Sequence, residues 1–224
     1  MKLSGWIEKA MAYLGMPLLF ALVGYIILYA AASPVLVPVH NLISLMSLDD
    51  KMSLQDDSSY DDLFTNQSVP ETGETVDASS ITFPAFGALF GNLSIDGRSV
   101  DAPLFFGDSN NELKRGVGQY NGSAYPGCGG TILIGGHNNS YFNGLKNVEA
   151  GDIITLKTNY GTYRYRVTKT AVLPESDTTA YDLNAREENL VLYTCYPFDM
   201  LGLTPNRYFV YAKYESGPRV LLNK

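Results

Sequence analysis

From residue 81 onward, the sequence is a series of short β-forming runs separated by turn residues. Runs rich in β-branched and aromatic side chains lie between clusters of Gly, Asn, Asp and Pro. Such runs predict strands, and such clusters predict the turns between them. We expect strands at 88–95, 102–106, 131–134, 153–157, 162–172, 189–194 and 207–213. The pattern predicts a mainly all-β domain, either a barrel or a sandwich.

A few short helices or turns are expected between these strands. The candidate segments are 113–120, 141–147 and 181–188, and Asn159-Tyr160-Gly161 fits a hairpin turn. Pro197 cannot continue a central strand, so the strand over 189–194 should end at or just after Cys195.

The N-terminus carries an uncharged run of 22 residues, 11–32. As a helix it would be about 33 Å long, enough to cross a bilayer core. Lys2 and Lys9 precede it and the first acid beyond it is Asp49, so the positive-inside rule places residues 1–10 in the cytoplasm. We expect one transmembrane signal anchor in the cell membrane, with the rest of the chain extracellular. The alternative is a signal peptide cleaved after the small residues 30–32.

Residues 33–80 have the composition of an acidic extracellular stalk. They hold nine acids and only Lys51, a net charge of −8, and are rich in Asp, Ser and Thr. Residues 81–224 hold 13 acids and 13 bases, so the acidity belongs to the stalk. No basic run is present, and we expect no nucleic-acid partner. We divide the remainder into a catalytic domain, 81–216, and a tail, 217–224.

The candidate catalytic residues lie where predicted strands end or begin. Cys195 ends one strand, and Arg207 begins the next. If the two strands pair, the thiol lies close to the guanidinium, and such a cation activates a thiol and can hold a developing oxyanion. His137 follows the strand over 131–134 and two glycines that let the chain turn sharply. It is the only histidine of the domain, and we interpret it as an acid–base residue.

Cysteine and histidine counts restrict the other chemistry. With two cysteines and two histidines, we expect no zinc site of the usual Cys/His kind. Cys128 lies in a Gly-rich turn, Pro126-Gly127-Cys128-Gly129-Gly130, where we interpret it as a small structural side chain. A redox disulfide between Cys128 and Cys195 is the alternative.

Three motifs together resemble the active-site pattern of sortases, the membrane-anchored cysteine transpeptidases of Gram-positive bacteria. They are Thr194-Cys195, Arg207 twelve positions later, and the upstream Gly135-Gly136-His137. The forms Thr-Cys-Tyr-Pro-Phe and Gly-Leu-Thr-Pro-Asn-Arg-Tyr most resemble class D, over residues 84–214. The resemblance implies a closed β-barrel of about eight strands, with His137, Cys195 and Arg207 catalytic. We expect Thr194 and Tyr196, which flank Cys195, to contact the substrate.

The resemblance also implies the reaction. The Cys195 thiolate attacks the Thr carbonyl of a Leu-Pro-x-Thr-Gly-like sorting motif on a secreted protein, and His137 protonates the leaving amine. An amine of a peptidoglycan precursor then releases the thioester, which anchors the protein to the cell wall. Without that amine, water completes a slow hydrolysis, as in a thiol protease. The reaction that the resemblance implies requires neither a metal nor an organic cofactor.

Two alternatives to this function remain, one with a different acceptor amine and one without catalytic activity. A pilin-polymerising sortase would use a Lys amine of a pilin subunit, but these enzymes often carry a second, C-terminal membrane helix that this tail lacks. The other alternative is a non-catalytic, membrane-tethered β-barrel that binds wall peptides. Val69-Pro70-Glu71-Thr72-Gly73 itself resembles a sorting signal; we interpret it as a linker turn, with a tethered pseudosubstrate as the alternative.

Overall fold

The computed structural model describes residues 13, 15–27, 75–198, 200 and 204–221. The chain divides into two compact units, Met1–Lys51 and Met52–Lys224. In the first unit, residues 16–27 are α-helical and their apolar side chains are exposed, Phe20 at 70% and Leu18 at 69%. The remainder of the predicted span 11–32, and the segment 69–73, lie outside the described residues. Within the described parts of the chain, no helix combines the length and apolar character that crossing a membrane requires.

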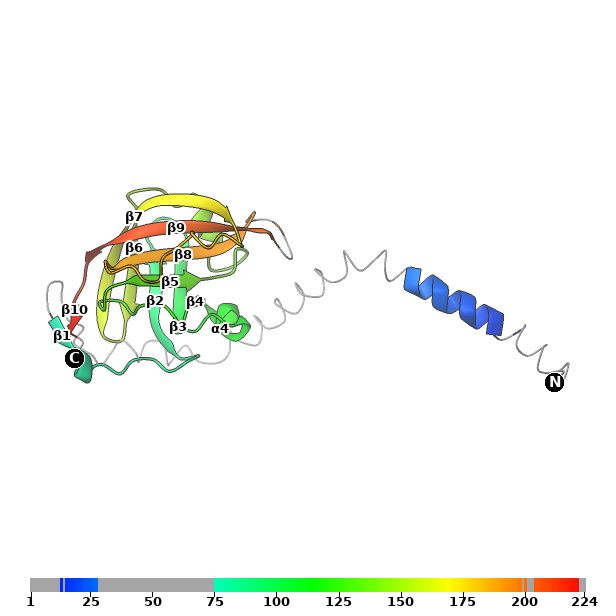
Figure 1. The fold of residues 1–224 in the computed structure, drawn as a ribbon, viewed down its shortest axis with the longest axis horizontal. Helices are drawn as coiled ribbons and strands as arrows, with labels where there is room; N and C mark the ends of the chain where they lie inside the picture. The colour runs from blue at the N-terminus through cyan, green and yellow to red at the C-terminus, as the bar shows by residue number, and fades with distance from the viewer. Residues whose placement is uncertain (1–12, 14, 28–74, 199, 201–203, 222–224) are drawn as a thin grey trace. The chain divides into compact units, whose positions relative to one another are not determined.

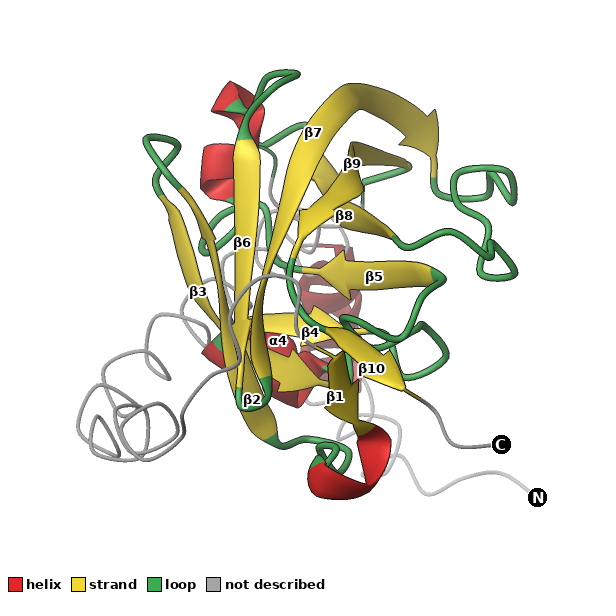
Figure 2. Ribbon diagram, turned by 90° about the vertical axis from the view of Figure 1, so that its left-hand side faces the viewer, coloured by secondary structure: helices red, strands yellow, loops and turns green. Residues whose placement is uncertain are grey.

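The second unit is built on a closed barrel whose strands follow the order β2-β3-β4-β5-β8-β9-β7-β6 (Figure 1; Figure 2). The strands are β2 (Leu89–Ile95), β3 (Val100–Phe106), β4 (Val117–Gln119), β5 (Thr131–Gly135), β6 (Ile153–Thr158), β7 (Gly161–Pro174), β8 (Asn189–Tyr196) and β9 (Asn206–Ser216). The prediction of a mainly all-β closed barrel is confirmed, and all seven predicted strands are present with slightly different ends. The pairs β3–β4 and β5–β8 are parallel.

The barrel contains one strand that the sequence pattern did not predict. Helix α4 spans Asn110–Arg115, and the chain then turns into β4, so the expected helix or turn over 113–120 is wrong for its last part. Gly116 lies between the two elements. Any other residue there would place its Cβ 2.2 Å from the carbonyl oxygen of Pro103. Glycine therefore allows β4 to run close beside β3.

The other connections follow the prediction in part. The 3₁₀ helix η3 (Asn143–Asn147) falls within 141–147, and Asn159 and Tyr160 form the predicted turn between β6 and β7. Residues 181–188 contain turns rather than a helix.

Segments assigned to the stalk and the tail pair with each other. Strand β1 (Thr75–Asp77) is followed by the 3₁₀ helix η2 (Ala78–Ser80) and forms a two-stranded parallel sheet with β10 (Arg219–Leu221). Thr75 is the partner of Arg219 in this register. Strands thus lie on both sides of the boundaries we drew: β1 precedes residue 81, and β10 follows residue 216.

Side chains on the two faces of the strands form two hydrophobic clusters. The interior cluster fills the barrel and includes Leu190 and Leu192 from β8. The outer cluster consists of Leu133, Ala180, Val191 and Phe209. Because side chains alternate along a strand, residues 191, 193 and 195 of β8 share the outer face.

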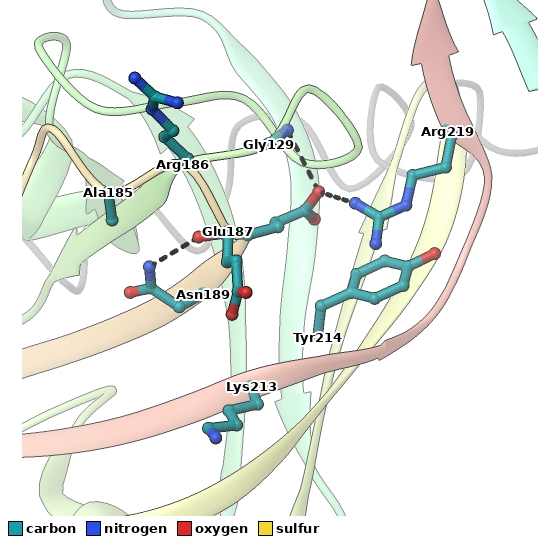
Figure 3. Close-up of a pocket in the computed structure, with 9 residues that line it drawn as sticks. Gly129, Ala185, Arg186, Glu187, Asn189, Lys213, Tyr214 and Arg219 are labelled. Carbon is teal, nitrogen blue, oxygen red and sulfur yellow. Dashed lines mark hydrogen bonds and ion pairs between the residues drawn. The ribbon is translucent and has the colours of Figure 1, made fainter.

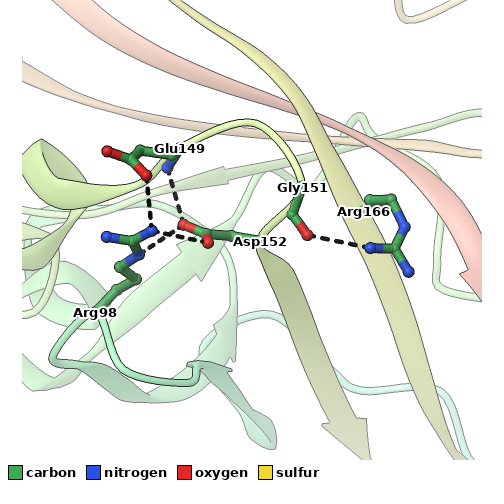
Figure 4. A network of polar contacts seen from close by, with 5 residues as sticks. All are labelled: Arg98, Glu149, Gly151, Asp152 and Arg166. Atoms are coloured by element: carbon green, nitrogen blue, oxygen red, sulfur yellow. Dashed lines mark hydrogen bonds and ion pairs between the residues drawn. The ribbon is translucent and has the colours of Figure 1, made fainter.

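A polar network joins the β2–β3 turn to the loop before β6 (Figure 4). Arg98 donates from Nε to Asp152 at 2.7 Å and from a terminal nitrogen to Glu149 at 3.2 Å. Arg166 of β7 donates to the carbonyl oxygen of Gly151 at 3.2 Å. These contacts close one end of the barrel with groups partly exposed to solvent, so we assign them a structural role.

Candidate active site

Cys195 and Arg207 lie directly opposite each other in neighbouring strands. The antiparallel ladder of β8 and β9 pairs Cys195 with Arg207. Directly opposed residues of an antiparallel pair have Cα atoms about 4.5–5.5 Å apart and side chains on the same face. The Cys195 side chain is half-buried, and that of Arg207 is 18% exposed. The structure therefore brings the predicted thiol and guanidinium together on the outer face of the barrel.

His137 reaches the same end of the barrel from the other neighbour of β8. Strand β5 runs parallel to β8 and pairs Gly135 with Tyr193, and Gly136 donates its N–H to the carbonyl oxygen of Tyr193 at 3.2 Å. Two residues beyond each paired position lie His137 and Cys195. The sheet order β5-β8-β9 thus places the three predicted catalytic residues on three adjacent strand ends, with Cys195 in the middle.

Two side chains fasten the His137 loop to the Cys195 strand. The Thr194 hydroxyl donates to the carbonyl oxygen of Gly136 at 2.7 Å. The buried Asn138 amide donates to the carbonyl oxygen of Pro197 at 2.9 Å. These bonds lie immediately before and after His137 in the chain, so they hold the backbone of His137 beside the end of the Cys195 strand. Asn138 was not singled out from the sequence, although it directly follows His137.

Thr194 and Tyr196 alternate with Cys195 and face the other side of β8. Thr194 is 1% exposed. Tyr196 is half-buried, stacks on Tyr208 with ring centroids 6.3 Å apart, and meets Phe198 edge-on at 6.1 Å. In this structure the two residues support the strand end, and their predicted contact with a substrate stays a prediction.

Burial and a nearby cation both disfavour protonation of His137. Burial lowers the pKa of the ring, and the ammonium of Lys114, in α4, lowers it further. The imidazole is therefore neutral at physiological pH, the form that can accept a proton.

Tyr193 forms part of the outer face between the three residues and the outer cluster. Its hydroxyl donates to Asp108 at 3.1 Å, and its ring stacks on Phe209 at 6.2 Å. Burial, and then the Asp108 carboxylate, raise the pKa of Tyr193, so it stays protonated. A Cβ on Gly135 would lie 2.7 Å from this ring, and glycine there leaves room for it.

Arg207 is held from two sides. One terminal nitrogen donates to the carbonyl oxygen of Thr204 at 2.8 Å, to the hydroxyl of Thr204 at 3.3 Å, and to the carbonyl oxygen of Asn206 at 3.1 Å. The other forms an ion pair with Glu175 at 2.7 Å. Glu175 was not predicted as a site residue, and its position 32 residues before Arg207 gave no indication of the pairing.

Cys128 lies at the opposite end of the strands from Cys195. It precedes β5, whose first residue pairs with Asn189, six residues before Cys195. Six strand residues span about 20 Å, so a disulfide between the two thiols cannot form in this fold. Both cysteines are free. Burial, and then the Glu188 carboxylate, raise the pKa of Cys128 to about 11, which fits a structural thiol.

A pocket of about 630 Å³ opens near Cys128 rather than at the predicted site (Figure 3). Its wall includes the buried Glu188 carboxylate, which accepts hydrogen bonds from the N–H groups of Gly127 and Gly129 and is paired with Arg219 at 2.8 Å. The Arg219 guanidinium in turn lies over the ring of Tyr214 at 3.7 Å. These groups pair with one another and join the Gly-rich turn to β10. Because the pocket lies at the Cys128 end of the strands, it is separate from the three predicted catalytic residues.

The arrangement of Cys195, His137 and Arg207 supports acyl-transfer chemistry. A half-buried thiol supplies the nucleophile, a neutral imidazole at the next strand end can accept and return its proton, and a fixed cation stands on the other side. Charge that develops on a carbonyl oxygen beside the thiol would be stabilised by that cation.

Comparisons with known proteins cover this part of the chain. The family model described as "Sortase domain" matches residues 93–215, a range that contains His137, Cys195 and Arg207. Sortase D of Bacillus subtilis (strain 168) is 35% identical over 130 residues, which are 58% of this chain and 66% of that protein. The match therefore spans slightly less than two thirds of the relative.

Solved structures share the barrel. A Clostridium perfringens sortase D5 transpeptidase superposes with a TM-score of 0.53 at 24% identity, covering 59% of this chain and 82% of that one. Listeria monocytogenes sortase A superposes with a TM-score of 0.53 at 25% identity, covering 61% of this chain and 92% of that one.

Proposed function

Because this chain belongs to the sortase family, as the match over residues 93–215 shows, we propose that it is a membrane-anchored transpeptidase. In this proposal it cleaves a Leu-Pro-x-Thr-Gly-like sorting motif after Thr through a thioester on Cys195. It then transfers the acyl group to a cell-wall amine. The similarity to Bacillus subtilis sortase D supports a class D-like enzyme.

One observation carries the proposal: Cys195 and Arg207 are direct partners in the β8–β9 ladder, and β5 brings His137 to the same strand ends. A protein that only binds peptides would need a surface that complements the peptide. It would not need a thiol between an imidazole and a guanidinium. The residue types, their order in the chain and the strand register all agree with this proposal, although the three residues come from three different strands.

The first half-reaction forms the thioester. The Cys195 thiol gives its proton to the neutral His137 ring as the sulfur attacks the carbonyl carbon of Thr in the bound motif. Arg207 stabilises the negative charge that develops on the carbonyl oxygen. His137 then returns the proton to the leaving nitrogen, the C–N bond breaks, and the acyl group stays on Cys195.

The second half-reaction uses the same residues in reverse. An acceptor amine attacks the thioester carbonyl while His137 removes a proton from its nitrogen. The C–S bond breaks, Cys195 leaves as the thiolate, and the protonated His137 returns the proton to sulfur. The lowered pKa of His137 keeps its ring unprotonated, the form that can act as the base in this step. Water in place of the amine gives hydrolysis.

Membrane attachment through the N-terminus is also part of the proposal. Residues 11–32 carry no charged side chain, and the helical residues 16–27 expose apolar side chains such as Phe20 and Leu18. Exposed apolar surface of this kind is stable in a lipid environment. Retention of the full chain in carbonate-washed membranes, and its release by a deletion of residues 11–32, would support the anchor. Full release of the intact, unprocessed chain by carbonate would refute it.

The activity is tested with the full chain in detergent and a quenched library of Leu-Pro-x-Thr-Gly and Leu-Pro-x-Thr-Ala peptides. We expect cleavage after Thr by the wild type and none by Cys195→Ala, with mass spectrometry locating the cut. A short amine-bearing peptide should divert the product from acid to amide. If the folded wild type cleaves no member of the library, the proposal gives way to a binding module.

A further inference from the structure

The Glu175 carboxylate forms an ion pair with Arg207. Strand β7 ends at Pro174, which pairs with Asn206, so the next residue, Glu175, reaches the start of β9. The Glu175 N–H donates to the carbonyl oxygen of Pro205 at 2.8 Å, and its carboxylate lies 2.7 Å from a terminal nitrogen of Arg207. Backbone pairing and the ion pair thus place Glu175 within the region where we propose that a substrate binds.

The two sides of the guanidinium differ in burial. The nitrogen that faces Thr204 donates to groups of a residue that is 4% exposed. The nitrogen that faces Glu175 meets a side chain that is 65% exposed. The Thr204 contacts are shielded from water and fix the guanidinium. The Glu175 contact is open to water, where an ion pair contributes little and is readily exchanged.

We propose that the Glu175 carboxylate competes with the substrate for Arg207. In the resting protein, it neutralises part of the positive charge of Arg207; during turnover, a substrate oxygen replaces it. The inference rests on the function proposed above and assigns a regulatory role to a residue outside the catalytic trio. While Glu175 is paired, the positive charge beside Cys195 is partly neutralised, and one nitrogen of Arg207 is occupied. When the substrate binds, the Glu175 side chain turns into solvent, and that nitrogen becomes available for the carbonyl oxygen that gains charge.

The alternative role for Glu175 is to hold Arg207 in a productive position. The Thr204 and Asn206 contacts already fix the guanidinium from the buried side. Loss of the exposed partner should therefore leave the cation in place, whereas loss of a required support would displace it. The two roles predict opposite changes in activity when the charge of Glu175 is removed.

Glu175→Gln is the decisive variant because it keeps the shape of the side chain and removes its charge. Glu187→Gln is the matched control: it removes a carboxylate from the same β7–β8 connection, at an exposed position away from Arg207. With an uncharged peptide at low salt, we expect kcat/KM of Glu175→Gln to rise about two- to fivefold over wild type, the range of an exposed ion pair. Glu187→Gln should stay at the wild-type value.

Salt dependence separates electrostatic competition from a structural effect. Raising NaCl from 20 mM to about 0.5 M screens an exposed ion pair, so wild-type kcat/KM should rise toward that of Glu175→Gln, which should not respond. A fall or no change in kcat/KM for Glu175→Gln, or the same salt response as wild type, would overturn the proposal.

The thiol gives a readout that needs no turnover. In a Cys128→Ser background, the iodoacetamide rate at Cys195 should rise about two- to fivefold on Glu175→Gln, because an uncompensated cation beside the sulfur favours its attack on iodoacetamide. Equal alkylation rates would refute the inference even if no peptide were cleaved. Absence of peptide cleavage with a faster alkylation rate would refute the proposed transpeptidation and leave the competition between Glu175 and Arg207 supported.

Discussion

The hydroxyl of Thr194 should matter for catalysis although its side chain faces the opposite side of β8 from Cys195. Thr194→Val replaces the hydroxyl with a methyl group of similar size at a position that is 1% exposed. The variant loses the 2.7 Å bond to the carbonyl oxygen of Gly136, the residue immediately before His137. The end of β5 is then fastened to β8 mainly by the Gly136 N–H and by Asn138.

The expected costs follow from this geometry. Loss of one hydrogen bond, with a carbonyl left unpaired, lowers the free energy of unfolding by about 1–3 kcal/mol. For a domain of this size, 2 kcal/mol lowers Tm by about 4–8 °C. Displacement of a catalytic group by about 1 Å can reduce the rate about 100-fold, so we expect kcat/KM to fall about 10- to 100-fold.

Thr131→Val is the matched control at the other end of β5. Thr131 is also 1% exposed, and its hydroxyl donates to the carbonyl oxygen of Asp182 at 2.5 Å and accepts from the side-chain amide of Asn189 at 2.9 Å. We expect a similar loss of Tm, measured by thermal unfolding, with kcat/KM per folded enzyme within twofold of wild type. If Thr194→Val loses stability as Thr131→Val does but keeps wild-type kcat/KM, the fastening of the His137 loop does not position the ring.

Four further predictions concern His137, Glu188 and the two thiols. Lys114→Gln should raise the pKa of His137 toward its ordinary value, though burial keeps it lower, and should move the acid limb of kcat/KM to higher pH; NMR titration of the His137 ring would check this, and an unchanged titration would contradict it. Because the folded state disfavours the protonated ring, stability should fall as pH drops below about 6.5, and less so in that variant. Glu188→Gln removes a fully buried charge paired with Arg219 and should lower the free energy of unfolding in denaturant by about 3 kcal/mol. Peptide cleavage per folded enzyme should keep its kcat/KM, and an unchanged free energy of unfolding would refute the structural role of Glu188. Iodoacetamide at pH 8 should label Cys195 well before Cys128, whose pKa is about 11, and equal labelling would contradict the structural role of Cys128.

Much of the barrel was predictable because its long strands alternate. Tyr163, Tyr165 and Val167 are buried while Arg164 and Arg166 are exposed, as the pattern along β7 predicts. The strands that were missed lack this signal. Strand β4 is three residues long and contains a glycine, and β1 and β10 are three-residue strands that pair across more than 140 positions of the chain.

The candidate site was predictable to the level of strand ends. His137, Cys195 and Arg207 each follow or begin a run that reads as a strand, and the ladder registers bring these ends together. Contacts through space were not predictable. The ion pair of Glu175 with Arg207 depends on where β7 ends, a property of the folded sheet rather than of the local sequence.

During turnover, Cys195 should carry the acyl group of the cleaved sorting motif as a thioester. Intact mass spectrometry of the full chain, quenched in acid soon after mixing with the best library peptide and no amine acceptor, tests this most directly. We predict an added mass equal to the peptide up to and including Thr, located on Cys195, removed by hydroxylamine and absent in Cys195→Ala. Cleavage of the peptide at an equal rate by the wild type and Cys195→Ala, or an adduct on Cys128 instead, would show that Cys195 is not the nucleophile.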